Sequence, residues 1–391
     1  MKIFKVLFVA IIALGMTACN NDDVPDMTGE KDATISIKVF PASNGTTVRA
    51  TGDLTAPGVE PAGLAAESAV KSLEVWIFQG DVLDAYKSAA GNEVTDIAAH
   101  IGARDVIVVA NAEIGQKNSK DELLATLKGL PADIASKGLI MTAEPFNITL
   151  EKGKNYYGYT GTDIAGEEKY HTSTPLAITR VNARVAIVSA VLDYTNVPAN
   201  QQVVFDELKD VEVAMYNVPE QTKLFGTDLA TNADYLFGAK WPSPENTYVG
   251  ADDATATPTA SLTNNVTDAL PVVITNAPYY YVNESNGTDE MFIVLRAKLY
   301  KDEEPVLTVK DLYTDADGYT YYPVWVNATK EGYSYTGDNT GDGIIRRNTQ
   351  YNISLTIKGL GNPTIDEVEK AWLDVAVEVK PWKVVNQTVV W

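Results

Sequence analysis

The two histidines of the chain, His100 and His171, are the side chains that an acid–base or nucleophilic enzyme site would most readily use. A Ser-His-Asp site would need one of them, and no nucleophile motif accompanies either. No zinc-ligand spacing is present, and a glycosidase pair is defined by the distance between its carboxylates, which a sequence does not give. We therefore interpret both histidines as surface or hydrogen-bonded residues and predict a protein that is not an enzyme and needs no cofactor.

Two short acidic segments have the composition of calcium loops, residues 338–343 (DNTGDG) and residues 315–318 (DADG). An EF-hand loop needs a glutamate at its twelfth position, and the first segment lacks one. Runs of Asp, Asn and Gly are also the usual composition of turns. We interpret both segments as turns, and the sequence predicts no metal site.

Cys19 has the context that most clearly predicts a chemical modification, because it is the only cysteine of the chain and follows an export signal. A basic start precedes residues 6–14, an uncharged apolar run of signal-peptide length that is too short to span a bilayer. Residues 16–19 (MTAC) resemble a lipobox, in which the cysteine thiol is diacylated, although Met16 stands where leucine is usual. The alternative is an ordinary secretory signal in which the cysteine is incidental.

The composition limits the number of domains and the kinds of partner that the chain can have. An exported chain with one cysteine cannot form an internal disulfide, so its stability has to come from burial of a core. The 391 residues, 45% of them hydrophobic, are enough for about two domains after removal of the signal. The net charge of −21 argues against nucleic acids and anionic membrane surfaces as partners. Any membrane anchoring is expected to come from lipid on Cys19.

Short alternating runs rich in Val, Ile, Thr and Tyr predict an all-β protein. The predicted strands are residues 34–40, 73–77, 106–109, 146–150, 176–191, 211–216, 292–299, 319–326 and 351–357. Strands at this frequency with few helices indicate β-sandwich domains.

One helix is predicted with a clear start and end. Ser119 is expected to cap it and Glu122 to complete a capping box, with a leucine stripe up to Leu127 and Gly129 ending it. A polar stretch with a proline, residues 195–202, indicates the domain boundary. Residues 252–265 are expected to form an exposed Ala/Thr-rich loop.

Arg49 lies in a segment, residues 41–69, whose Gly, Pro, Ala, Thr and Ser content predicts a flexible linker. A trypsin-like protease could bind this arginine in extended form, and the alternative is a solvated loop arginine. The linker follows a first strand in which Ile35, Ile37 and Val39 alternate with polar residues.

The tail of the chain is apolar, although chain termini are usually frayed and polar. Its hydrophobic residues are Leu373, Val375, Val377 and Val379, then Val384, Val385, Val389, Val390 and the final Trp391. Such a terminal strand closes either its own sheet or the sheet of another molecule.

In these features the chain resembles the major fimbrial subunit family of Bacteroidia, the type V pilins. The motifs that carry the resemblance are the lipobox at Cys19 with its polar start at 20–23, Arg49-Ala50 after the first strand, and residues 109–111 (VAN), 179–185 (TRVNARV), 216–219 (YNVP), 322–324 (YPV), 347–351 (RNTQY) and 379–382 (VKPW). The order and spacing of these motifs cover nearly the whole chain.

The resemblance implies two transthyretin-like or Ig-like β-sandwich domains with one or two short helices. The implied parts are a signal peptide (1–18), a propeptide with the first strand (19–49), an N-terminal sandwich (50–197) and a C-terminal sandwich with a donor tail (198–391). An arginine-specific protease would cut between Arg49 and Ala50 and remove the first strand of a lipoprotein precursor anchored in the outer membrane. A C-terminal strand of the next subunit would fill the groove, either from Leu373–Val379 or from Val384–Val390.

This scheme predicts a stalk subunit of a cell-surface fimbria, whose partners are other copies of itself and other fimbrial subunits. The alternatives are a tip or anchor subunit, or a surface lipoprotein that keeps its lipid and binds glycans on an aromatic platform. Residues 279–281 and 319–322 contain the tyrosines that such a platform would use. A mature N-terminus at Ala50 would support the pilin, and an acylated Cys19 the retained lipoprotein.

Overall fold

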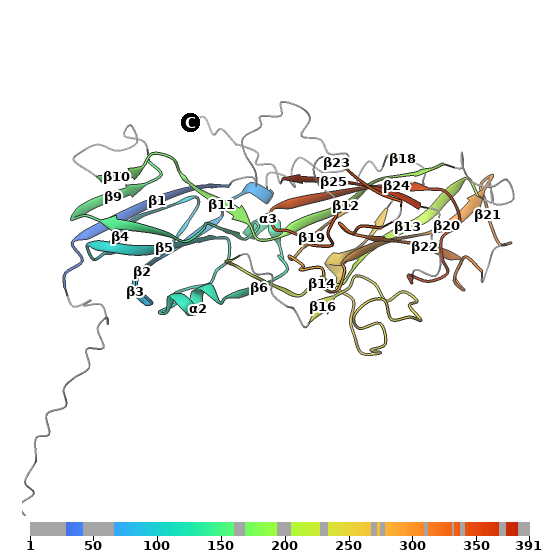
Figure 1. The fold of residues 1–391 in the computed structure, drawn as a ribbon, viewed down its shortest axis with the longest axis horizontal. Helices are drawn as coiled ribbons and strands as arrows, with labels where there is room; N and C mark the ends of the chain where they lie inside the picture. Colours follow the sequence, from blue (N-terminus) through green and yellow to red (C-terminus); the bar gives the residue numbers. More distant parts are fainter. Residues whose placement is uncertain are drawn as a thin grey trace, which may run out of the picture.

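The computed structural model describes residues 29–41, 66–159, 169–193, 205–226, 234–266, 272–273, 278–308, 312–330, 332–336, 341–366 and 373–381. These residues form an elongated molecule with two β-rich halves placed end to end (Figure 1). In the part of the chain that is described, no helix has both the length and the apolar character needed to cross a membrane.

The first half is a single curved sheet that encloses its own core. Its elements are β1 (Ala33–Pro41), β2 (Ser72–Gln79), β3 (Val82–Ala90), β4 (Glu93–Ala99), β5 (Gly102–Ala110), α2 (Lys120–Leu124), β6 (Leu127–Gly129), α3 (Ile134–Lys137), β7 (Met141–Thr142), β8 (Phe146–Leu150), β9 (Gly153–Tyr157), β10 (Lys169–Thr172) and β11 (Leu176–Arg180). The strand order is β10-β9-β1-β11-β7-β5-β2-β3, with β4 also paired to β1 and β8 to β5. Side chains of β1 face those of β2 and β5 across this core, as Ile37, Ile77 and Val108 illustrate.

The second half is a sandwich of two sheets. Its elements are β12 (Ala183–Leu192), β13 (Glu207–Tyr216), β14 (Val218–Pro219), β15 (Gln221–Lys223), β16 (Tyr235–Leu236), η1 (Ala260–Leu262), β17 (Thr263–Val266), β18 (Val272–Val273), β19 (Tyr279–Val282), β20 (Phe292–Lys301), β21 (Glu304–Pro305), β22 (Tyr319–Trp325), β23 (Tyr333–Thr336), β24 (Thr349–Ile357) and β25 (Leu373–Pro381). One sheet has the order β18-β12-β24-β25-β23, with β19 paired to β12. The other has the order β17-β13-β20-β21, with β22 paired to β20.

The all-β sandwich prediction is confirmed, and the alternation seen in the sequence explains it. Strand positions that face the space between the two sheets are apolar and buried, for example Val213, Leu295 and Ile353. The outer face of the second sheet is covered by residues of the segment 234–266, where Trp241 packs near Tyr216 with ring centroids 6.1 Å apart. Part of the outer face of this sheet is therefore buried as well.

The predicted helix begins as expected but ends early. The hydroxyl of Ser119 accepts a hydrogen bond from the backbone N–H of Glu122, which is the predicted cap. The helix ends at Leu124, so the prediction of a stripe reaching Leu127 and a stop at Gly129 is wrong. Leu127 to Gly129 instead pair as β6 with β15 of the second half. That pairing joins residues about a hundred positions apart, and local helix signals carry no information about it.

The strands change from one half to the other between β11 and β12. The predicted strand region 176–191 is divided at Val181 and Asn182, and β12 pairs with β19 and β24 of the second half. The polar stretch at 195–202, which indicated the boundary, comes after this junction in the sequence. The junction itself consists of two residues between buried strands and contains no polar linker. The segment 252–265 was expected to be an exposed loop throughout, but its last part is regular structure. There η1 buries Leu262, and β17 pairs with β13.

The two halves share a further apolar cluster at their junction. Leu224 and Phe225, which follow β15, pack on Trp76 and Val109 on the outer face of the first sheet. The hydroxyl of Thr142 in β7 also donates to the carbonyl of Leu224 at 3.2 Å. The halves are thus joined by buried contacts in addition to the chain connection.

Candidate functional site

Strand β1 occupies an interior position in the first sheet, although it is the first strand of the described residues. It pairs antiparallel with β4 on one side and parallel with β9 on the other, and its last residues pair with β11. Ala33, Ile35, Ile37 and Val39 are all buried, with exposed fractions of 0–1%. Ile35, Ile37 and Val39 thus share one face of β1, as the alternation in the sequence predicts. This face completes the core of the first half.

Polar contacts add to the strand pairing of β1. The side-chain amide of Asn155 in β9 donates to the carbonyl of Thr34 at 3.2 Å. On the other side, the backbone N–H of Asp96 donates to the hydroxyl of Ser36 at 3.0 Å, where the register of β4 shifts. Further along, the backbone N–H of Val39 donates to the carbonyl of Asn92 at 3.0 Å. These bonds fix the register of β1 between its neighbours.

The residues in front of β1 are held by a charged cluster on β3 and β5. The Asp84 carboxylate accepts from the Arg104 guanidinium at 2.7 Å and from the backbone N–H of His100 at 3.0 Å. The His100 ring lies 2.8 Å from Asp84 Oδ1 and 3.0 Å from the carbonyl of Gly29, and Lys31 Nζ donates to the Asp84 carbonyl at 2.5 Å. Burial alone would raise the pKa of Asp84, but the hydrogen bonds from Arg104 and His100 outweigh it and lower the pKa.

Strand β25 lies within the sheet of its own half. It pairs antiparallel with β24 along its whole length and parallel with β23. Val375 and Val377 are buried in the core between the two sheets. The structure therefore places Leu373, Val375, Val377 and Val379 in a strand of their own sheet. The second predicted donor segment, with Val384, Val385, Val389 and Val390, lies outside the described residues.

A buried ion cluster lies where the two halves meet, and no pattern in the sequence indicates it. Glu67 Oε1 accepts from Arg184 at 2.7 Å and from the Tyr281 hydroxyl at 2.8 Å. Arg180 donates to the Glu67 carbonyl at 2.8 Å and to Asn348 at 3.0 Å. Burial lowers the pKa of Arg180 to about 10, which leaves it charged at neutral pH. Glu67 stands at the end of the predicted flexible linker, and that prediction is wrong for this residue.

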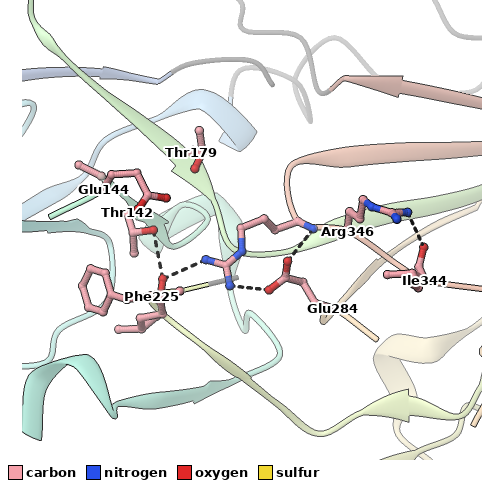
Figure 2. A pocket seen from close by; sticks show the side chains of 11 residues that line it. Thr142, Glu144, Thr179, Phe225, Glu284, Ile344 and Arg346 are labelled. Carbon is pink, nitrogen blue, oxygen red and sulfur yellow. Dashed lines mark hydrogen bonds and ion pairs between the residues drawn. The ribbon is translucent and has the colours of Figure 1, made fainter. Parts of the chain in front are cut away.

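A pocket of about 400 Å³ opens at the junction and is lined by both halves (Figure 2). Its lining includes Thr142, Glu144 and Thr179 from the first half, and Phe225, Glu284 and Arg347 from the second. The Arg347 guanidinium forms an ion pair with Glu284 and donates to the Leu224 and Lys223 carbonyls, both at 3.0 Å. These four residues all belong to the second half, and Thr142 of the first half reaches them by donating to the Leu224 carbonyl. We therefore interpret the pocket as a feature of the joint.

The histidines have the bonded environments that the sequence interpretation favoured. His100 belongs to the Asp84 cluster, and His171 Nε2 lies 3.0 Å from the Asn155 side-chain oxygen. Burial lowers the pKa of His171. Among the described residues no group of three or more His, Cys, Asp or Glu is placed to hold a metal ion. The segment at 315–318 is a turn closed by the Asp315 carboxylate.

The positions that are predicted to carry lipid or to be cut by a protease do not belong to the described part of the chain. Cys19, Arg49 and Ala50 lie outside the described residues. Between them, however, the structure describes β1, which the predicted cut would separate from the rest of the protein.

The described residues form an all-β protein with a buried strand β1 and two joined halves, and comparison with known proteins identifies its family. Residues 33–180 match the model of the major fimbrial subunit protein FimA, and residues 183–382 match the FimA4 pilin C-terminal domain. Major fimbrium subunits FimA type-2 and type-3 of Porphyromonas gingivalis are 32% and 31% identical to this chain, each over the full length of both proteins.

Solved structures agree with this assignment. A fimbrilin from P. gingivalis W83 superposes with a TM-score of 0.69 at 29% identity, covering 92% of this chain and 99% of that one. A putative cell adhesion protein from Parabacteroides distasonis has the same fold, with a TM-score of 0.62 at 21% identity, covering 91% and 99% of the two chains. This chain belongs to the FimA family of major fimbrial subunits. It is a structural component of a cell-surface fimbria, and its partners are fimbrial subunits.

Proposed function

We propose that this chain is a stalk subunit that is exported as a lipoprotein with lipid on Cys19, cut by an arginine-specific protease after Arg49, and polymerised by donor-strand exchange. The precursor is anchored in the outer membrane, and the finished fimbria supports adhesion. The observation that carries the proposal is the position of β1, a buried interior strand that lies upstream of Arg49. A cut at that residue separates a core strand from its own domain.

The energetic argument follows from what β1 buries. Ile35, Ile37 and Val39 each contribute about 1.5–3 kcal/mol by burial, so their loss costs on the order of 5–9 kcal/mol. The facing edges of β4 and β9 also lose their backbone partners. A groove with two open strand edges and an apolar floor accepts an extended segment as a new strand.

We assign the donated strand to the last residues of the chain, 382–391. Strand β25 is an unfavourable donor because its withdrawal would expose Val375 and Val377 and open a second groove between β24 and β23. Residues 382–391 include Val384, Val385, Val389 and Val390, the apolar side chains that a strand in place of β1 would bury. Exchange of this kind is head-to-tail and does not close, so it produces a filament.

Mass spectrometry of filaments sheared from the cell surface tests the processing. Subunits that begin at Ala50 and lack lipid are expected. Arg49→Ala and Arg49→Lys should both leave a lipidated, unpolymerised precursor, and the lysine variant separates an arginine-specific protease from one that also accepts lysine. High-molecular-weight ladders from Arg49→Ala cells would contradict the scheme, and mature subunits that keep acylated Cys19 would indicate an anchor or a retained surface lipoprotein.

Two truncations test the choice of donor. A chain ending at Pro381 keeps β25 and should fold and be processed, yet fail to polymerise. A chain ending at residue 372 also loses β25 and should be unstable as a monomer. Filament formation by the Pro381 truncation would show that residues 382–391 are not the donor.

A further inference from the structure

We propose that Asp342 and Glu284 withhold the Arg346-Arg347 pair from the protease that cuts after Arg49, and so confine processing to the predicted linker. The inference rests on the proposed function, in which the processing protease recognises arginine. It concerns the other arginines of the precursor, which the same protease meets.

All the arginines of the described residues are bonded within the fold. The chain has seven arginines, and all except Arg49 lie in the described part. A protease that is specific for arginine takes the side chain into its own pocket and needs the neighbouring backbone free of the fold. Each of the six has a printed partner for its guanidinium, in the pairs Arg104–Asp84, Arg180–Glu67 carbonyl, Arg184–Glu67, Arg296–Glu212, Arg346–Asp342 and Arg347–Glu284.

Exposure distinguishes one of these six arginines from the others. The Arg346 side chain is 51% exposed, whereas the Arg347 side chain is 18% exposed. Both residues lie in the connection between β23 and β24, outside any strand. The other four lie in strands, with Arg296 at 18% exposed and Arg104, Arg180 and Arg184 buried. Among the described arginines, the Arg346-Arg347 pair is therefore the one that a protease would reach most easily.

Asp342 holds the first arginine of the pair by closing the turn in front of it. Its Oδ1 atom accepts from the Arg346 guanidinium at 3.1 Å and from the backbone N–H of Ile344 at 3.0 Å. The side-chain amide of Asn327 donates to the same oxygen at 2.8 Å, which fixes the carboxylate to the body of the second half. The backbone N–H of Arg346 donates to the Tyr351 hydroxyl at 3.0 Å.

Glu284 holds the second arginine through both its backbone and its side chain. One carboxylate oxygen accepts from the backbone N–H of Arg347 at 3.1 Å, and the other forms an ion pair with the Arg347 guanidinium. The guanidinium also donates to the carbonyls of Leu224 and Lys223 at the joint. The backbone N–H groups of both arginines are thus bonded within the fold, so cleavage beside them requires local opening.

A cut at this pair would be costly for assembly. It would detach β24, β25 and residues 382–391 from the rest of the chain. The proposed exchange links subunits only if the donated segment remains covalently part of the subunit that donates it. The proposed filament therefore depends on a cut in the predicted linker and on no cut between β23 and β24.

The experiment digests purified precursor with an arginine-specific protease and follows the products by intact-mass spectrometry. Wild type should be cut after Arg49 and yield a product of residues 50–391. Asp342→Asn and Glu284→Gln should each raise cleavage after Arg346 or Arg347 roughly tenfold, because cleavage follows the open population and each variant weakens a charge-assisted contact that opposes opening. No rise in either variant, or a wild type that is cut as fast at this pair as after Arg49, overturns the proposal.

Glu212→Gln is the matched control, because it removes the carboxylate partner of an arginine that lies within a strand. Arg296 is paired on one side with β13 and on the other with β22, so loss of Glu212 leaves its backbone inside the sheet. This variant should show no new cut. A new cut after Arg296 of the same size would mean that loss of any ion pair exposes arginine, and would overturn the assignment to Asp342 and Glu284. A precursor that resists cleavage after Arg49 would instead refute the proposed processing.

Discussion

Replacing Ile37 by alanine should destabilise the precursor without weakening the finished fibre. Ile37 is 0% exposed in the core of the first half, so the substitution removes buried volume that the surroundings cannot refill. Such changes cost about 2–5 kcal/mol. Each kcal/mol lowers the melting temperature of a domain of 150–250 residues by about 2–4 °C, so the precursor should melt roughly 4–20 °C lower.

The fibre should respond differently, because the proposed processing removes Ile37 before assembly. Polymers from Ile37→Ala cells should dissociate in hot detergent at the same temperature as wild-type polymers. Ile77→Ala is the matched control, since Ile77 is also 0% exposed in the same core but lies on β2, which stays in the mature chain. It should lower the melting temperature of the precursor and the dissociation temperature of the polymer. Ile37→Ala polymers that weaken as the Ile77→Ala polymers do would mean that β1 remains in the fibre.

Three further changes probe the joint, the charged cluster and the helix. Glu67→Gln should cost about 3–5 kcal/mol in urea unfolding, because it leaves Arg184 buried without its carboxylate, whereas the exposed control Glu113→Gln should leave stability unchanged. Asp84→Asn should destabilise the precursor at neutral pH. Because the folded pKa of Asp84 is lowered, wild type and variant should converge as the pH falls below about 4. Ser119→Ala should cost about 1 kcal/mol by removing the cap of α2.

Alternation within strands is the part of the fold that the sequence predicts well. The runs at 211–216, 292–299 and 351–357 all lie within β13, β20 and β24, because a sandwich buries every second residue of these strands. The same alternation places Ile35, Ile37 and Val39 on one face of β1. It does not say which strands lie on either side of β1, since pairing between distant segments leaves no local pattern.

What the sequence does not reveal are the contacts that join distant segments. Glu67 lies in a stretch with linker composition, and its burial depends on Arg184 and Tyr281, more than a hundred residues away. The pairing of β6 with β15 is of the same kind. Such residues gain their role from partners that local propensity cannot specify.

The contacts at both ends of the predicted linker separate cutting from release. Pro41 ends β1 in the first sheet, and Glu67 is buried at the joint, so a cut after Arg49 falls between two anchored points. In the proposed scheme the cut would remove the chain connection but none of the buried contacts of β1, which would then be held only as a bound peptide at lower effective concentration. An incoming donor strand of the proposed scheme would therefore have to displace β1 from an occupied groove. The rate of assembly should depend on what holds β1 in place, which makes the contacts of Gly29 and Lys31 with the Asp84 cluster a control point for fibre growth.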